Sequence, residues 1–199
     1  MIAWINFFVM LASGLVCTWL YVKSVGPAAL EKKIGEIAYK KCVRYRMISS
    51  ILMIPFLISW GVYYFYPLPL PLPRFFPWKW WISITVGMCI AIPCLYILGK
   101  AVRDAGEETT RPKKEHKLYS GIYKKIRHPQ LLGELPFAWV VAFLLNSPFL
   151  ALLSFVCIVP LFYIMAWAEE KDLIIRYGEE YLEYKKNTGC IIPKRSKSR

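Results

Sequence analysis

The chain of 199 residues is 57% hydrophobic and 20% charged, whereas soluble domains are only about 45–50% apolar. Its formal net charge of +13 at pH 7 would suit nucleic acid, but the basic residues fall in a few segments between long uncharged blocks and form no nucleic-acid-binding motif. This composition excludes an ordinary soluble domain and predicts an all-α integral membrane protein without a nucleic-acid partner.

Five apolar blocks predict about five transmembrane helices, because roughly 20 apolar residues cross the hydrocarbon core of a bilayer. In chain order they are Ile2–Val22, Met47–Tyr66, Trp80–Leu98, Gln130–Asn146 and Phe149–Ala168. The fourth is short and contains Pro136. The first has no basic residue before Lys23, so we expect a retained helix and not a cleaved signal peptide.

The basic residues predict the orientation of these helices. Of the 26 Lys and Arg residues, seven lie in segment 23–46, nine in 99–129 and eight in 169–199, whereas the loop 67–79 holds only two. Cytoplasmic loops of membrane proteins are enriched in such residues. We therefore expect the N-terminus outside and the C-terminus in the cytoplasm. We also expect Glu107 and Glu108, within the second basic segment, to be solvated.

The segment after the last apolar block predicts an amphipathic helix at the membrane interface. Its apolar and aromatic residues recur at three- and four-residue spacing, and charged residues fill the other face. These residues are Leu173, Ile174, Tyr177, Tyr181 and Tyr184. Gly178 is a potential break in this helix, because glycine weakens a helix interior.

Two polar constellations flank the last two blocks. Arg127-His128-Pro129 precedes the fourth, and a proline suits the first position of a helix, whose free N–H groups attract a carboxylate. Glu169-Glu170 ends the fifth, and acids at this depth are functional candidates that would pair with a cation. A short turn joins the two blocks, so both constellations should meet and could bind the zwitterionic methionine part of S-adenosylmethionine. The alternatives are an ordinary helix start contacting lipid phosphate, and a helix end where Lys171 and Arg176 neutralise the glutamates.

The stretches G-I-Y-K-K-I-R-H-P-Q-L-L-G and A-E-E-K-D-L-I-I-R-Y-G-E-E-Y-L-E-Y resemble the C-terminal half of the isoprenylcysteine carboxyl methyltransferase family, and less closely phospholipid N-methyltransferases. The resemblance covers 113–194 and implies a methyltransferase-like hairpin with the cofactor region there, while composition predicts membrane helices and loops in 1–112 and a basic tail in 195–199. It implies S-adenosyl-L-methionine as the cofactor. The cofactor contacts that it implies are Lys117, Leu118, Tyr123, His128, Pro129, Gln130, Leu131, Glu169 and Glu170.

Departures from the family pattern leave the methyl acceptor open. Leu131 stands where the family usually has a tyrosine, and Met165 stands where eukaryotic members carry a substrate-binding arginine. Glu134 completes an R-H-P-x-x-x-G-E pattern similar to that of membrane enone and sterol reductases, which use a reduced nicotinamide cofactor. An NADPH-dependent membrane reductase and a non-catalytic membrane protein are therefore the alternatives to a methyltransferase.

These observations lead us to expect a membrane methyltransferase whose lipophilic or amphipathic acceptor, a carboxyl, amine or thiol, arrives from the bilayer. Glu134 or His128 is the candidate base for an acceptor that must lose a proton. Six cysteines without a C-x-x-C pair, and two histidines, predict no metal site. We expect no specific protein partner. The active site would face the cytoplasm, in the cell membrane of a prokaryote or the endoplasmic reticulum of a eukaryote.

Overall fold

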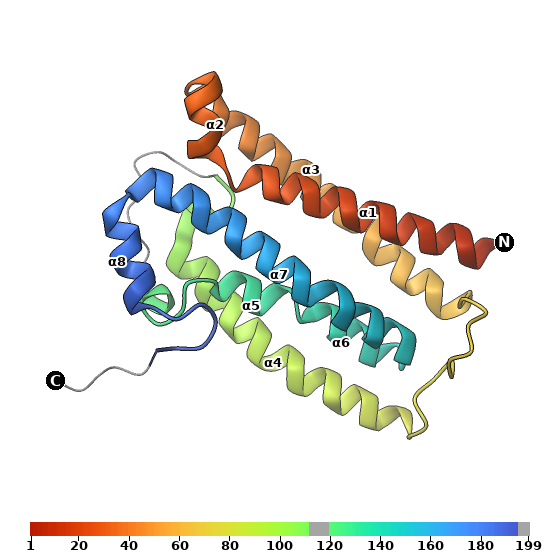
Figure 1. The fold of residues 1–199 in the computed structure, drawn as a ribbon. Helices are drawn as coiled ribbons and strands as arrows, with labels where there is room; N and C mark the ends of the chain where they lie inside the picture. The colour runs from red at the N-terminus through yellow and green to blue at the C-terminus, as the bar shows by residue number, and fades with distance from the viewer. Residues whose placement is uncertain (112–119, 195–199) are drawn as a thin grey trace.

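The computed structural model describes residues 1–111 and 120–194, and these residues are almost wholly helical (Figure 1). The elements are α1 (Ile2–Ser24), α2 (Pro27–Ile34), α3 (Ile37–Phe65), α4 (Trp80–Ala105), η1 (Gly106–Thr109), η2 (Gly121–Lys124), α5 (Pro129–Glu134), α6 (Phe137–Leu144), α7 (Pro148–Tyr177) and α8 (Glu179–Asn187). No β-strand forms in the described residues, where one isolated bridge joins Ile126 to Gly189. Lys117 and Leu118, two of the predicted cofactor contacts, lie outside the described residues.

Within residues 1–111 and 120–194, four helices are long and apolar enough to cross a membrane: Ile2–Ser24, Ile37–Phe65, Trp80–Thr109 and Pro148–Tyr177. Large apolar side chains remain exposed along them, among them Phe8, Leu15, Ile51, Phe155 and Trp167. Exposed apolar surface on this scale is typical of contact with lipid. The prediction of an all-α membrane protein is confirmed, and the orientation across the bilayer stays a prediction.

The predicted fourth span, Gln130–Asn146, is not one continuous helix. It divides into α5 and α6, and the apolar segment Pro129–Leu144 is shorter than the other four spans. Pro136 sits at the N-cap of α6. A proline lacks the N–H that would continue the hydrogen-bond ladder, and its ring clashes with the preceding turn, so the helix restarts there.

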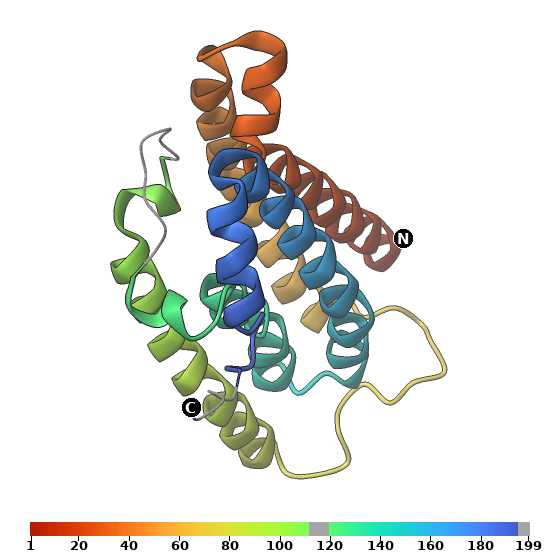
Figure 2. The ribbon, with the colours of Figure 1, turned by 60° about the vertical axis from the view of Figure 1, so that its left-hand side comes forward.

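The helices form two layers. α1 and α3 run side by side as one layer, which with α2 we call the N-terminal hairpin (residues 2–65), while α4 packs on α5 and α6 in the other (Figures 1 and 2). α7 joins the layers, since it contacts α1, α2 and α6. A core between them contains Met10, Trp60, Tyr63, Ala142 and Leu150.

Two close contacts join elements within this bundle. The N-cap residue of α2 is Gly26, which has no side chain to cap the helix, and Asp172 on α7 supplies the cap instead. Its Oδ1 accepts a hydrogen bond of 2.8 Å from the backbone N–H of Ala29. On the other layer, Gly133 of α5 lies against α4, where a Cβ would come within 2.7 Å of Leu98 Cβ. Both contacts hold cavity-lining segments in place.

The C-terminal region folds back on the bundle. α7 ends at Gly178, whose φ of +58° is costly for residues with a side chain, and α8 follows directly. The predicted break at Gly178 is therefore confirmed. In Figure 1, α2 and α8 lie at one end of the bundle, while the N-terminus and the loop between α3 and α4 lie at the other.

Candidate active site

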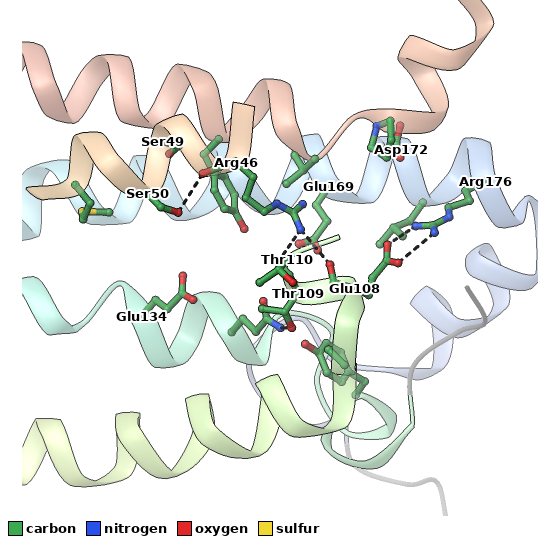
Figure 3. Close-up of a pocket in the computed structure, with 18 residues that line it drawn as sticks. Arg46, Ser49, Ser50, Glu108, Thr109, Thr110, Glu134, Glu169, Asp172 and Arg176 are labelled. Atoms are coloured by element: carbon green, nitrogen blue, oxygen red, sulfur yellow. Dashed lines mark hydrogen bonds and ion pairs between the residues drawn. The ribbon is translucent and has the colours of Figure 1, made fainter. Parts of the chain in front are cut away.

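A cavity of about 270 Å³ lies between the N-terminal hairpin and the layer of α4 and α5 (Figure 3). Its walls come from α1, α2, α3, α4, η1, η2, α5 and α7. Its charged lining includes Arg46, Glu134, Glu169, Asp172 and Arg176. Most ligand pockets are apolar with a few polar groups, so this density of charge indicates a polar or zwitterionic ligand.

Three of the predicted cofactor contacts line the cavity: Tyr123, Gln130 and Glu169. The Gln130 side chain is oriented by a 2.9 Å hydrogen bond that its Nε2 donates to Thr109 Oγ1. Tyr123 is buried, and burial raises the pKa of its phenol, so it stays neutral at physiological pH. The candidate base Glu134 also lines the cavity, and within the described residues its carboxylate makes no hydrogen bond or ion pair.

The other described contacts lie behind the wall of the cavity. Glu170 is 9% exposed, and its carboxylate receives three cations, a set that we call the Glu170 cluster. The cluster joins Glu170 to Arg127 Nε at 2.7 Å, to Lys185 Nζ at 2.6 Å and to His128 Nε2 at 3.1 Å. Leu131 packs against Met165 and Ala166 in an apolar cluster, and Pro129 is fully buried.

The two predicted constellations do meet. His128 Nδ1 lies 3.0 Å from Glu169 Oε2, while the other ring nitrogen reaches Glu170. Arg127 is held on its other side by the C-terminal region, because its backbone N–H donates to the carbonyl of Gly189 at 2.8 Å and Nη1 donates to the carbonyl of Thr188. Glu169 therefore faces the cavity, whereas Glu170 joins α5, α7 and the C-terminal region.

His128 should make the stability of the protein depend on pH. Burial alone lowers the pKa of His128, but hydrogen bonds to Glu169 and Glu170 outweigh it and raise the pKa from 6.5 to about 9. The imidazolium therefore stabilises the fold fully below about pH 6.5, and this contribution, on the order of 3 kcal/mol, is lost as the pH rises through about 9. Thermal unfolding at a series of pH values should show this loss for the wild type and a flatter profile for His128→Gln. Equal slopes for the two proteins would contradict the assignment.

Of the two glutamates predicted to be solvated, Glu107 is exposed, but Glu108 is not. Glu108 is buried, 7% exposed, and accepts a 2.6 Å ion pair from Arg176 Nη1. The expectation of a solvated Glu108 is therefore wrong. Arg176 is engaged there and Lys171 stacks over Trp167, so neither neutralises Glu169 or Glu170 as the alternative interpretation required.

Arg46 lines the cavity but was not predicted from the sequence as a site residue. It lies at the predicted boundary of the second apolar block, and such a position gives no signal that separates it from an interfacial arginine. In the structure its Nη1 donates to the carbonyls of Glu108 at 3.0 Å and Thr109 at 2.7 Å. Its guanidinium thereby fixes η1 over the cavity, as Figure 3 shows.

The phospholipid methyltransferase family model matches residues 81–180, half of the chain. The chain belongs to the phospholipid methyltransferase family. A curated relative, protein-S-isoprenylcysteine O-methyltransferase of Saccharomyces cerevisiae, is 32% identical over 124 residues, which cover 56% of this chain and 52% of the relative. The chain thus spans about half the length of that relative. No solved structure matches the chain.

The matched segment confirms the resemblance seen in the sequence, and it contributes one wall of the cavity. Residues 81–180 include Tyr123, Gln130, Glu134 and Glu169. The N-terminal hairpin lies outside this segment and contributes the opposite wall, with Tyr21, Arg46, Ser49, Ser50 and Met53.

Proposed function

We propose that the protein is an S-adenosylmethionine-dependent methyltransferase acting on a lipophilic or amphipathic acceptor. The observation that carries this proposal is the cavity in which Tyr123, Gln130 and Glu169 of the family-matched segment converge. In this proposal the cofactor region is 113–194, the helices of 1–112 complete the bundle, and 195–199 is a basic tail. The active site faces the cytoplasm, in the cell membrane of a prokaryote or the endoplasmic reticulum of a eukaryote.

The side chains of the cavity fit the proposed cofactor. Its sulfonium and ammonium groups need anionic partners, and Glu169 and Glu134 line the cavity. Its carboxylate and hydroxyl groups need donors and acceptors, and the amide of Gln130 can supply both. The cavity of about 270 Å³ is near the lower end of the roughly 300–1,000 Å³ of small-molecule sites.

The chain's own contribution to the reaction is position and charge. When bound, S-adenosylmethionine supplies an electrophilic methyl group to the acceptor. The carboxylate of Glu169, fixed by His128, attracts the positively charged groups of the cofactor. The amide of Gln130, fixed by Thr109, orients the part of the cofactor that lies beside it. Holding two reactants in attack geometry can supply roughly 7–11 kcal/mol of the lowering of the barrier, so no nucleophile from the protein is required.

The open side of the cavity supports an acceptor that arrives from the membrane. Ser50 and Met53 on α3 and Glu134 on α5 line the cavity and are exposed. α3 is long and apolar enough to cross a membrane, and α5 begins the shorter apolar segment Pro129–Leu144. An acceptor with an apolar chain could therefore keep that chain in lipid while its reactive group reaches Glu169.

Titration calorimetry on the purified protein tests the function. We expect S-adenosylmethionine and S-adenosylhomocysteine to bind with micromolar affinity, roughly −8 kcal/mol, and NADPH not to bind. Binding of NADPH without binding of the adenosyl compounds would favour the membrane reductase. Absence of binding for all three, in protein with a cooperative unfolding transition, would favour a non-catalytic membrane protein.

The turnover of a Glu134→Gln variant distinguishes the classes of acceptor. A carboxylate or thiolate needs no base, whereas an amine or hydroxyl must lose a proton, and Glu134 is the lining carboxylate without a partner among the described residues. With a carboxylate acceptor, Glu134→Gln should keep its turnover within a few-fold of wild type. With an amine acceptor, turnover should fall by about 10²–10⁴ while S-adenosylhomocysteine still binds. Steady-state turnover and calorimetry on the same variant distinguish the two.

A further inference from the structure

The cavity contains a guanidinium without an acidic partner. Arg46 lines the cavity and makes no ion pair with a carboxylate in the described part of the chain. Its Nη1 is occupied by the carbonyls of Glu108 and Thr109, and Nε lies 3.5 Å from Ser24 Oγ. An arginine has five N–H donors in a planar fork, so the Nη2 side remains for a ligand.

The surroundings of Arg46 indicate that its guanidinium binds an anion and does not serve a structural role alone. It is half-buried, and a charge in that setting is stabilised by a second charge of opposite sign. The two carbonyls are neutral, so they orient the fork without neutralising it. Charge-assisted hydrogen bonds from a pre-oriented arginine are the strong mode of binding carboxylate or phosphate.

The location on α3 indicates which ligand brings this anion. Arg46, Ser50 and Met53 are spaced by four and three residues, so they share one face of α3. That face leads from the guanidinium to the exposed end of the cavity at Ser50 and Met53. A molecule that reaches the cavity from the bilayer would pass along this face and meet Arg46. Arg46 also lies outside the family-matched residues 81–180, whereas Glu169, Tyr123 and Gln130 lie within them.

We propose that Arg46 binds the anionic group of the methyl acceptor and so restricts the acceptor to amphiphiles that carry a carboxylate or phosphate near the reacting group. This inference rests on the proposed function, because it concerns the acceptor of the same cavity. Arg46 is a specificity-determining residue here. The carbonyl contacts of Nη1 hold it in position, and the Nη2 edge contacts the oxyanion.

Binding of amphiphiles tests the proposal without the methyl donor. The probes are laurate and dodecyl phosphate, with dodecanol as the neutral counterpart of equal chain length, titrated into protein in phosphatidylcholine nanodiscs. Wild type should bind the anions at least tenfold more tightly than dodecanol, and Arg46→Gln should lose that preference. Arg44→Gln is the matched control, because Arg44 is exposed on the same helix and does not line the cavity.

Affinity for S-adenosylhomocysteine, measured in the same variants, identifies the source of the anion. It should stay within about threefold of wild type in Arg46→Gln. A large loss there with an unchanged preference for anionic amphiphiles would show that the guanidinium serves the carboxylate of the donor, and would overturn the proposal. Equal affinities of wild type for the anions and dodecanol would also overturn it, even where the adenosyl compounds bind and the proposed function stands.

A variant that keeps the charge covers the case in which Arg46→Gln does not fold. Arg46→Lys retains a cation but loses the planar fork. A preference for anionic amphiphiles clearly below that of wild type would support the proposal. A preference equal to that of wild type would count against an oxyanion bound by the planar guanidinium. A single cooperative thermal transition for each variant shows that the comparison is made on folded protein.

Discussion

Replacing Glu170 by alanine is expected to lower the free energy of unfolding by about 3–5 kcal/mol, the usual result of removing one partner from a buried ion pair. The carboxylate receives Arg127, His128 and Lys185, and the side chains of Arg127 and Glu170 are only 10% and 11% exposed. Without it, Arg127 and the protonated His128 would stay buried with one anion fewer. Thermal or denaturant unfolding in detergent measures the change.

Two further variants serve as a control and as a test of the cause of this loss. Glu183→Ala on α8 removes an exposed glutamate and should change stability by less than about 0.5 kcal/mol. Adding Arg127→Met to Glu170→Ala should recover part of the loss, because the uncompensated buried cation is then gone. Stability of Glu170→Ala equal to that of Glu183→Ala would show that the Glu170 cluster does not hold the C-terminal region.

The neighbouring glutamate should behave in the opposite way. Glu169→Gln is expected to weaken binding of S-adenosylhomocysteine by about 10- to 100-fold, as charge-assisted hydrogen bonds contribute roughly 1.5–3 kcal/mol. Its side chain is 30% exposed and lines the cavity, and its carboxylate pairs with His128 Nδ1 at 3.0 Å. The fold should survive, because Glu170 still pairs with His128 and Arg127. Calorimetry and thermal unfolding on the same preparation measure both quantities.

The pair of variants assigns different roles to adjacent residues. Loss of ligand affinity in Glu169→Gln with the unfolding temperature within a few degrees of wild type supports a cavity ligand. Affinity equal to wild type would place the donor elsewhere than against Glu169. Loss of affinity together with unfolding would make Glu169 part of the Glu170 cluster, and would contradict the separation argued from the structure.

Part of the candidate site was predictable from the sequence. Charges at the ends of apolar blocks are rare enough to stand out, and the short turn between the last two blocks brings their ends together, so the meeting of His128 with Glu169 and Glu170 follows from topology. The different directions in which the side chains of Glu169 and Glu170 point do not follow from topology. Successive residues on a helix point about 100° apart, so only the packed helices show that Glu169 faces the cavity and Glu170 faces Arg127.

The sequence by itself determined the class of the protein, because a bilayer demands long uncharged helices and these are visible as composition. It also determined the family, through motifs whose residues are close in the chain. The tertiary structure decided the break at Pro136, the burial of Glu108 against Arg176 and the place of Arg46 in the cavity. These depend on contacts between residues far apart in the chain, such as Arg46 with Glu108, and no local pattern encodes which distant side chain a charged residue will meet.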